Sequence, residues 1–178
     1  FTRPKLGLVE FEGSRENNIL QIGGPPHVPP AFKDTRPACA PEARYKGLTH
    51  EWGKLYAMAS ADGLTWRPMQ EGPVQTEGAF DTINTAFWDS VTGCYRSYTR
   101  SWADPQRDFA PSPDVHAGCV RTIQSATSED FLHWTRPVQN EYADGDRAMQ
   151  LYTNAALPCP GAEHIYLSFP NRYVQERV

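Results

Sequence analysis

The sequence lacks three features that would assign it to common classes of protein. Its longest apolar stretches are a few residues, too short to cross a membrane. It contains no run of lysine and arginine and its net charge is −4, which argues against nucleic acid as a partner. Its four cysteines have no C-x-x-C spacing, so a structural zinc site is not expected. We therefore expect neither a membrane nor a nucleic acid among its partners.

Proline and glycine, by contrast, are frequent, with 16 and 13 copies in 178 residues. Aromatic residues make up 12% of the chain. Proline and glycine interrupt long helices and mark many connections, whereas aromatic residues favour strands. A chain of this length buries enough apolar surface for one ordinary domain. The composition predicts an all-β protein with short strands.

One motif occurs twice and gives the chain a period. Ser60-Ala61-Asp62-Gly63-Leu64-Thr65-Trp66 returns about 68 residues later as Ser128-Glu129-Asp130-Phe131-Leu132-His133-Trp134. A partial copy stands at the start, where Phe1-Thr2-Arg3-Pro4 matches Trp134-Thr135-Arg136-Pro137. Asp caps tight turns through the backbone, and Gly63 tolerates positive φ. The motif predicts hairpin turns that contact no substrate, followed by tryptophans that pack between neighbouring units.

Strand-like segments surround these turns in a repeated order. We expect a short edge at 31–34, strands at 44–48 and 54–59, and then strands at 82–88, 94–99 and 119–126. A hairpin at 89–93 ends in Gly93, and 100–117 is predicted to be a long polar loop. Further strands are expected at 150–154 and 164–169. Cys94 and Cys119 fall on two strands of one unit, where a disulfide and two free thiols are equally favoured.

Units of about 65 residues with three or four antiparallel strands are typical of β-propeller blades. The predicted boundaries are 1–22 for the end of one blade, 23–72 for a second, 73–140 for a third and 141–178 for the start of a fourth. The chain thus holds roughly two to three blades, fewer than a closed propeller needs. We expect the remainder of the propeller to be missing from this chain or supplied by another chain, and the isolated segment to aggregate or pair.

Several segments carry a resemblance to a known superfamily: 41–46, 60–66, 80–89, 93–98, 128–134 and 150–152. Together they resemble the five-bladed β-propeller glycoside hydrolases of families 32 and 43, which act on fructans, arabinans and xylans, and most of all the family 32-like branch. The resemblance implies a five-bladed propeller that hydrolyses a poly- or oligosaccharide with carboxylates at its axis. It favours a secreted or periplasmic protein over a cytoplasmic one. No cofactor is predicted, and a structural calcium ion at the axis stays an open alternative.

The resemblance also assigns roles to individual positions. Asp81 matches the Asp that opens an inner strand, orients the substrate and tunes the acid, although a strand cap is an equally good interpretation. The base Asp would precede Phe1. Asn154 stands where the acid Glu is expected, so acid catalysis would need a substitute, and the candidates are Asp144, Asp146 and Glu163.

Other polar residues complete the predicted site. Glu42 and Arg44 alternate, as they would on one face of a strand, and either line the axis or form a salt bridge; Asp34 could serve in place of Glu42. Arg100 and Arg121 form a predicted pair suited to uronates or sulfated sugars. The predicted catalytic residues are thus Asp81, Glu42 and Asp34, and the predicted substrate-binding residues are Arg44, Asn84, Arg100, Arg121, Asn154 and Trp88.

Aromatic and metal-binding candidates have simpler alternatives. Trp52, Trp88 and Trp102 are candidate platforms for sugar rings, but aromatic residues in propellers mainly pack blades together. His116 and Asp114 could bind a metal, although solvated side chains are favoured, and no metal site is predicted. Two other functions stay open. One is a noncatalytic carbohydrate-binding propeller, and the other is a sialidase-like propeller whose arginines would be Arg44, Arg100 and Arg121.

Overall fold

A computed structural model of the protein describes residues 2–21, 28–112, 118–142 and 149–174. Within these residues the chain forms β-strands and two short 3-10 turns, Pro41–Ala43 and Pro105–Arg107. The all-β prediction is therefore confirmed. No helix in these residues has the length and apolar character that a membrane span requires. Phe1, where the predicted partial repeat begins, lies outside the described residues.

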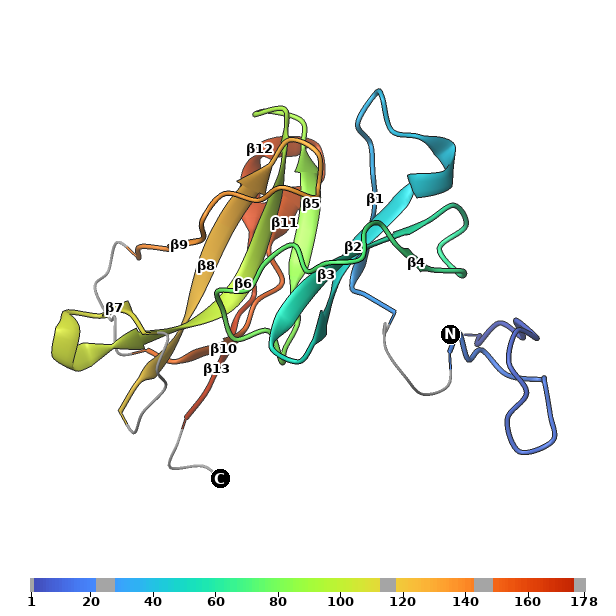
Figure 1. Ribbon diagram of the computed structural model, residues 1–178, viewed down its shortest axis with the longest axis horizontal. Helices are drawn as coiled ribbons and strands as arrows, with labels where there is room; N and C mark the ends of the chain where they lie inside the picture. Colours follow the sequence, from blue (N-terminus) through green and yellow to red (C-terminus); the bar gives the residue numbers. More distant parts are fainter. Residues whose placement is uncertain (1, 22–27, 113–117, 143–148, 175–178) are drawn as a thin grey trace.

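The first sheet contains four antiparallel strands that follow one another in chain order (Figure 1). They are β1 (Ala31–Lys33), β2 (Tyr45–Glu51), β3 (Lys54–Ser60) and β4 (Arg67–Pro68). β2 and β3 pair along their whole length, from Tyr45 opposite Ser60 to Glu51 opposite Lys54. The two strands predicted at 44–48 and 54–59 are therefore present, and the first of them continues to Glu51.

The second sheet repeats this order and is longer. It contains β5 (Thr85–Asp89), β6 (Cys94–Asp104), β8 (Val120–Ser128) and β9 (Val138–Gln139), while β7 (Ala110–Pro111) pairs with the far end of β6. The loop predicted at 100–117 is wrong in its first part, because β6 continues to Asp104 and stays paired with β8 and β7. The sequence did not predict this part of the strand because it contains the polar residues Arg100, Ser101 and Asp104. All three are buried in the structure.

The register of β6 and β8 also decides the cysteine question. Cys94 is the first residue of β6, whereas Cys119 adjoins Val120, which pairs with Ala103 at the other end of β6. The two thiols therefore lie at opposite ends of the sheet and cannot meet. All four cysteines are free, so the free-thiol alternative is the one the structure supports.

The last described strands form two small antiparallel pairs, one of which encloses the other in the sequence. β10 (Leu151–Thr153) pairs with β13 (Asn171–Arg172), and β11 (Leu157–Cys159) pairs with β12 (Ala162–Leu167). β12 packs on the second sheet, where the Tyr166 ring lies 5.4 Å from that of Phe87. Residues 2–21 extend away from the sheets (Figure 1). The sheets of the described residues are separate and antiparallel, and they do not close into a ring.

The repeated motif forms the same turn twice. In the first copy the Ser60 hydroxyl accepts hydrogen bonds from the backbone N–H groups of Asp62 and Gly63, and the Asp62 carboxylate accepts from those of Leu64 and Thr65. The second copy makes the same bonds with Ser128 and Asp130 as acceptors. In each copy the tryptophan indole donates to the carbonyl three residues earlier. The prediction of hairpin turns is confirmed.

The main core cluster joins the four-stranded first sheet to the five-stranded second sheet. Leu48 and Leu55 come from the first sheet and Tyr95 from the second, while Phe80 and Phe131 come from connections. The Tyr95 and Phe131 rings lie 5.1 Å apart in an edge-to-face contact. Burying side chains of this size contributes about 1.5–3 kcal/mol each, so the second turn, which contains Phe131, adds directly to the stability of the core.

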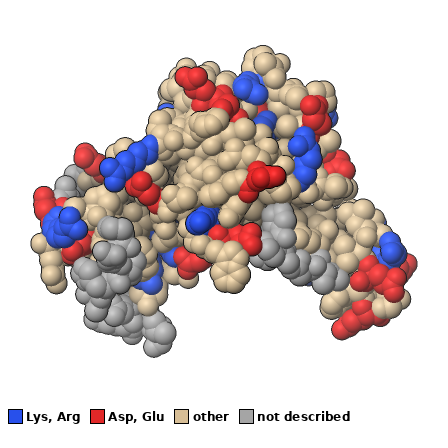
Figure 2. Space-filling view, in the orientation of Figure 1, with Lys and Arg blue, Asp and Glu red and all other residues tan. Residues whose placement is uncertain are grey.

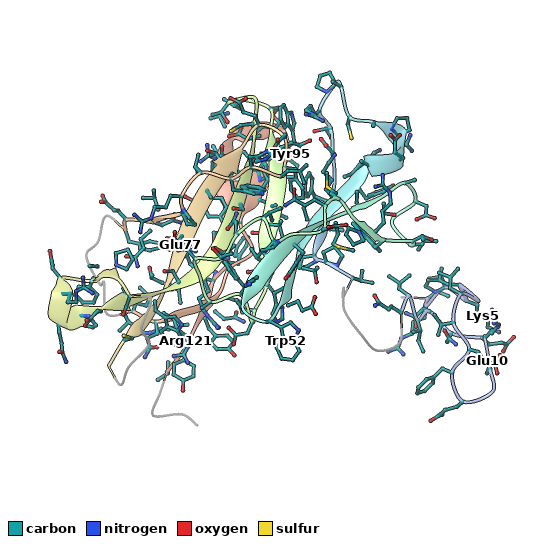
Figure 3. All side chains as sticks on the ribbon, in the orientation of Figure 1. Lys5, Glu10, Trp52, Glu77, Tyr95 and Arg121 are labelled. Atoms are coloured by element: carbon teal, nitrogen blue, oxygen red, sulfur yellow. The ribbon has the colours of Figure 1, made fainter. Side chains whose placement is uncertain are left out.

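Because successive strands are antiparallel, their connections alternate between two ends of the sheets. The turn end contains the two repeated turns, β3–β4 and β8–β9. The cavity end contains the connections β2–β3, β4–β5, β6–β8 and β9–β10. Figure 3 shows Tyr95, which pairs with Ser128, near the turn end, and Trp52 and Arg121 near the cavity end. Acidic and basic side chains are interspersed over the face drawn in Figure 2.

Candidate functional site

A large cavity of about 1610 Å³ opens at the cavity end of the sheets. All four connections of that end contribute to its wall. The wall includes Trp52, Glu77, Asp81, Trp102, Arg136 and Glu141. The cavity therefore lies where long connections from both sheets converge, whereas the two repeated turns lie at the other end. This convergence makes it the candidate functional site.

Asp81 is the one predicted catalytic residue among the described residues that both lines this cavity and keeps an exposed side chain, of which 70% is accessible. It lies just before β5, between the buried Phe80 and a loop held by Asn84. The Asn84 amide donates hydrogen bonds of 2.9 Å to the carbonyls of Phe80 and Thr82. Asn84 itself is buried, so it positions Asp81 and does not face a substrate.

The segment before Asp81 is fixed by further long-range contacts. The Gln124 amide donates a 2.6 Å hydrogen bond to the carbonyl of Glu77, and the backbone N–H of Ala79 donates to the carbonyl of Arg100. A Cβ atom on Gly78 would lie 2.5 Å from the Phe80 ring and 2.8 Å from the Gln124 amide nitrogen, so only glycine fits there. The backbone that presents Asp81 is thus rigidly placed.

Arg100 forms an ion pair with Asp81 from the adjacent strand β6. The Arg100 residue is only 2% exposed, and its Nε and Nη1 atoms have no hydrogen-bond partner among the described residues. A buried guanidinium is costly without compensation, so the ion pair and the aromatic rings around it stabilise Arg100. The arrangement presents the Asp81 carboxylate to the cavity with one oxygen held by Arg100.

Arg121 lies beside Arg100, as predicted, but aromatic rings surround it. Its guanidinium carbon lies 4.1 Å from the Tyr173 ring centroid and 4.7 Å from that of Trp102. Its Nη1 donates a 2.6 Å hydrogen bond to Gln150. Tyr152 contacts both arginines, at 5.1 Å from Arg100 and 5.5 Å from Arg121. The pair joins the second sheet to β10 and β13 and does not line the cavity.

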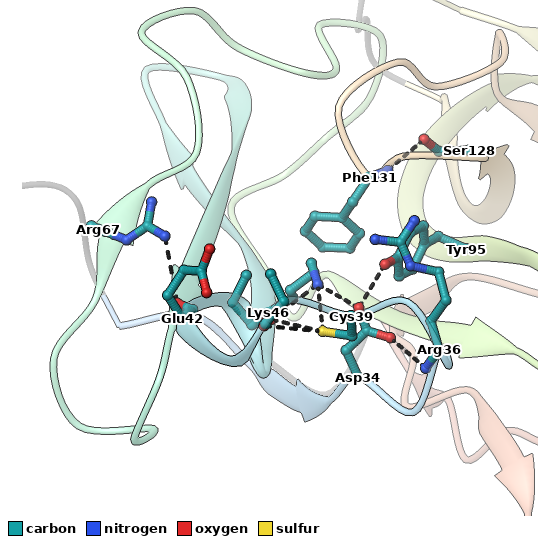
Figure 4. Close-up of polar contacts among 11 residues, drawn as sticks. Asp34, Arg36, Cys39, Glu42, Lys46, Arg67, Tyr95, Ser128 and Phe131 are labelled. Carbon is teal, nitrogen blue, oxygen red and sulfur yellow. Dashed lines mark hydrogen bonds and ion pairs between the residues drawn. The ribbon is translucent and has the colours of Figure 1, made fainter.

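Asp34 is located in a buried polar cluster near Tyr95 (Figure 4). Its carboxylate forms an ion pair with Lys46 and accepts hydrogen bonds from the Tyr95 hydroxyl at 2.6 Å and from the Arg36 backbone at 2.9 Å. Burial alone would raise the pKa of Asp34, but the hydrogen bonds from Lys46 and Tyr95 hold this pKa below its ordinary value. Its side chain has no exposed surface, so Asp34 stabilises the core and is not open to a substrate.

Glu42 and Arg44 do not alternate on a strand, so that part of the prediction is wrong. Pro41 begins a 3-10 turn that contains Glu42, and β2 starts only at Tyr45. Both side chains are exposed, the ion pairs of the described residues do not join them, and neither lines the cavity. Glu42 contacts Arg67 only through its carbonyl (Figure 4). Proline at the first position of the turn explains the departure from strand geometry.

Asn154 and Trp88 are also held within the protein. Asn154 is fully buried, accepts a hydrogen bond from Thr85 and donates one to the carbonyl of Tyr98. Trp88 packs against the main core, with its ring 5.0 Å from that of Tyr95. Asn154 thus links β10 to the second sheet. Trp88, which the sequence suggested as a platform for sugar rings, packs against the core instead.

The cavity wall adds residues that the sequence did not single out as catalytic. Glu77 forms an ion pair of 3.2 Å with Arg136, and Glu141 is exposed on the same wall. Glu77 and Arg136 are far apart in the sequence, so only the fold brings them together. Glu163, a proposed substitute acid, lies on β12 and does not line the cavity.

The described residues contain no group of three or more His, Cys, Asp or Glu side chains arranged to hold a metal ion. The candidate pair His116 and Asp114, and the substitute acids Asp144 and Asp146, lie outside the described residues. In comparisons with known proteins, the chain matches no protein-family model, no curated protein and no solved structure.

Proposed function

We propose that the chain is part of a five-bladed β-propeller of the glycoside hydrolase type and that the cavity binds a poly- or oligosaccharide. Two successive antiparallel sheets with the same strand order, each closed by the same Ser-x-Asp turn, support the comparison with propeller blades. The position of the cavity, at one end of both sheets, is where converging connections of blades would form a binding funnel.

The observation that carries this proposal is the placement of Asp81. Its carboxylate is presented to the cavity just before a strand, and the buried Arg100 holds one of its oxygens. Glycoside hydrolysis needs carboxylates around the scissile bond, because the leaving oxygen is protonated while positive charge develops on the sugar. Asp81 in an ion pair suits the binding of substrate hydroxyls and the stabilisation of that charge. Glu77 and Glu141 are the carboxyl groups on the same wall from which an acid would come.

The test is the Asp81→Asn substitution in the complete propeller, assayed by release of reducing sugar from fructan, arabinan and xylan. We expect release to fall by about 10²-fold or more. Because the substitution also removes the ion-pair partner of the buried Arg100, it should lower the melting temperature, and release is therefore measured at a temperature at which both proteins stay folded. Glu129→Gln, which removes an exposed carboxylate outside the cavity wall, serves as the matched control and should keep full activity. Unchanged sugar release by Asp81→Asn would remove Asp81 from the site.

A second candidate function is noncatalytic carbohydrate binding. It is favoured by Asn154, which stands where the resemblance expects an acid and makes only structural hydrogen bonds. Binding of the same glycans without any released sugar would support it. The sialidase-like alternative would need three arginines around one carboxylate. Arg44 adjoins the first sheet, whereas Arg100 and Arg121 belong to the second and are stacked on aromatic rings, so this alternative has no support from their placement.

A further inference from the structure

Trp52 occupies a position in the cavity wall that is unfavourable for the folded chain on two counts. It forms a two-residue turn with Gly53 between the paired residues Glu51 and Lys54 (Figure 3). Its φ is 49°, in the left-handed region that bulky side chains avoid. Trp52 is also 88% exposed, although its indole is a large, mainly apolar group.

The turn needs positive φ at the position of Trp52, but it does not need an indole there. A two-residue hairpin of this type requires positive φ at both central positions and is best served by Asn-Gly or Gly-Gly. Gly53 meets the requirement at the second position, with φ of 73°, whereas a bulky side chain stands at the first. The indole of Trp52 therefore adds strain and exposed apolar surface without a stabilising contact in the core. A role in binding is the physical reason for such a combination at the wall of a cavity.

Trp102 also lines the wall, but its ring contacts other side chains of the protein. The Trp102 ring lies 4.7 Å from the guanidinium carbon of Arg121 and 5.8 Å from that of Arg100, so it is used in packing. Trp52, by contrast, leaves its ring open to solvent. An open indole face with negative π density attracts the C–H groups of a sugar ring, whose hydroxyls can stay hydrated.

The size of the cavity indicates how much ligand it admits. Its volume of about 1610 Å³ exceeds the roughly 300–1,000 Å³ that is usual for small-molecule sites. The wall extends from Trp52 in the β2–β3 turn, through Asp81 before β5, to Glu141 after β9. A ligand that engages both Trp52 and Asp81 would therefore contact two sheets. This arrangement fits a chain of several sugar units better than a single unit.

We infer that Trp52 is a stacking platform for an uncharged sugar ring of an oligosaccharide, and that this ring is separate from the units beside Asp81. The inference rests on the proposed carbohydrate-binding function and specifies its substrate class as a polymer of uncharged sugars. The stacked unit adds binding energy remote from the reacting bond. Long oligosaccharides should thus bind more tightly than short ones, and Trp52 should account for the difference.

The experiment compares the complete propeller that contains this chain with its Trp52→Gly variant. The probes are hexasaccharides and disaccharides of fructose, arabinose, xylose and mannose, and binding is measured by calorimetry and by quenching of tryptophan fluorescence. Glycine suits the positive φ, so the variant should melt at a temperature equal to or higher than that of the parent. We expect its affinity for the bound hexasaccharide to fall about tenfold, with its disaccharide affinity unchanged. Phe11→Ala, which removes an exposed aromatic side chain outside the wall, should change neither.

The outcomes separate the inference from the proposed function. If the parent binds none of the glycans, the proposed function fails and Trp52 loses its assigned ligand. If the parent binds a hexasaccharide and the Trp52→Gly variant binds it equally well, only the stacking role is overturned. A change in oligomeric state on Trp52→Gly, seen by sedimentation and without a change in glycan binding, would assign the indole to a protein contact and also overturn the inference.

Discussion

The two ends of the sheets are built in different ways. At the turn end, Ser60 and Ser128 begin turns whose hydrogen bonds all join residues within one short motif. At the cavity end, the connection before β5 is held by residues distant in sequence: Gln124 bonds to Glu77, and Arg100 pairs with Asp81. Local hydrogen bonds thus specify the two Ser-x-Asp turns, none of whose residues lines the cavity, whereas tertiary contacts specify the connection that presents Asp81 to it. Loops held by a rigid scaffold are where binding residues are expected.

The largest effect is expected for the substitution Gly78→Ala at the cavity end. The new Cβ would lie 2.5 Å from the buried Phe80 ring, and Phe80 cannot move without disturbing the core. We expect a loss of about 1–3 kcal/mol in the free energy of unfolding, measured in urea, together with loss of the glycan binding that depends on Asp81. Gly72→Ala is the matched control, because an added Cβ there meets open space. Equal stability of the two variants would show that the β4–β5 connection is not held as tightly as its contacts indicate.

The next prediction sharpens the comparison at the turn end with a matched pair, Ser60→Ala and Ser128→Ala. Each serine is almost fully buried and accepts hydrogen bonds from two backbone N–H groups, so each substitution should cost about 1–2 kcal/mol. If the turns are locally specified, the two losses should agree within about 0.5 kcal/mol and add in the double variant. A large difference between them would mean that tertiary packing, and not the motif, governs one of the turns.

The smallest expected effect concerns Asp89, in the β5–β6 turn. Burial would raise the pKa of its carboxyl group, but hydrogen bonds from Thr92 and Tyr166 lower this pKa from 3.8 to about 2. Because the folded-state pKa lies below the unfolded one, the stabilisation is complete above about pH 4 and is lost as the pH falls towards 2. We expect this group to contribute about 1 kcal/mol to that loss.

Urea unfolding at pH 5 and pH 2.5 measures this contribution. Thr92→Val removes one hydrogen bond to the carboxylate and should reduce the pH dependence, and Asp89→Asn should remove the Asp89 share altogether. Asp130 and Asp34 also have lowered pKa values, so part of the acid destabilisation should persist in both variants. An unchanged pH profile in Asp89→Asn would contradict the assignment.

The sequence predicted the strands better than it predicted the site. Alternation in 54–59 identified β3, and Gly93 marked the end of the β5–β6 hairpin, where its φ is 71°. Asp81 was placed correctly before a strand, and the structure adds that it faces a cavity. Asp34 and Asn154 could not be separated from site residues by sequence, because a buried hydrogen-bonded polar side chain has the same identity as an exposed one.

Residues whose importance depends on neighbours distant in sequence were the hardest to predict. Nothing local distinguishes Glu77, which meets Arg136 only across the folded cavity wall. The Trp52-Gly53 dipeptide did carry a local signal, since glycine in a two-residue hairpin predicts positive φ, but its location at a cavity came from the fold. The polar residues in the second half of β6 led to the wrong prediction of a loop, because the strand with which they pair is distant in the sequence.

The repeated motif shows where the division lies between sequence and tertiary structure. The sequence by itself determined the all-β class, the period and the two Ser-x-Asp turns, because serine and aspartate satisfy backbone N–H groups a few residues away. Phe131, however, adopts a φ of 72° where the first turn has Gly63, and it is fully buried against Tyr95. Only the tertiary structure decided that, since burial of the phenyl ring offsets the backbone strain that glycine avoids in the first turn. The tertiary structure also decided the cavity and its wall, because the contacts that form them join residues that are distant in the sequence.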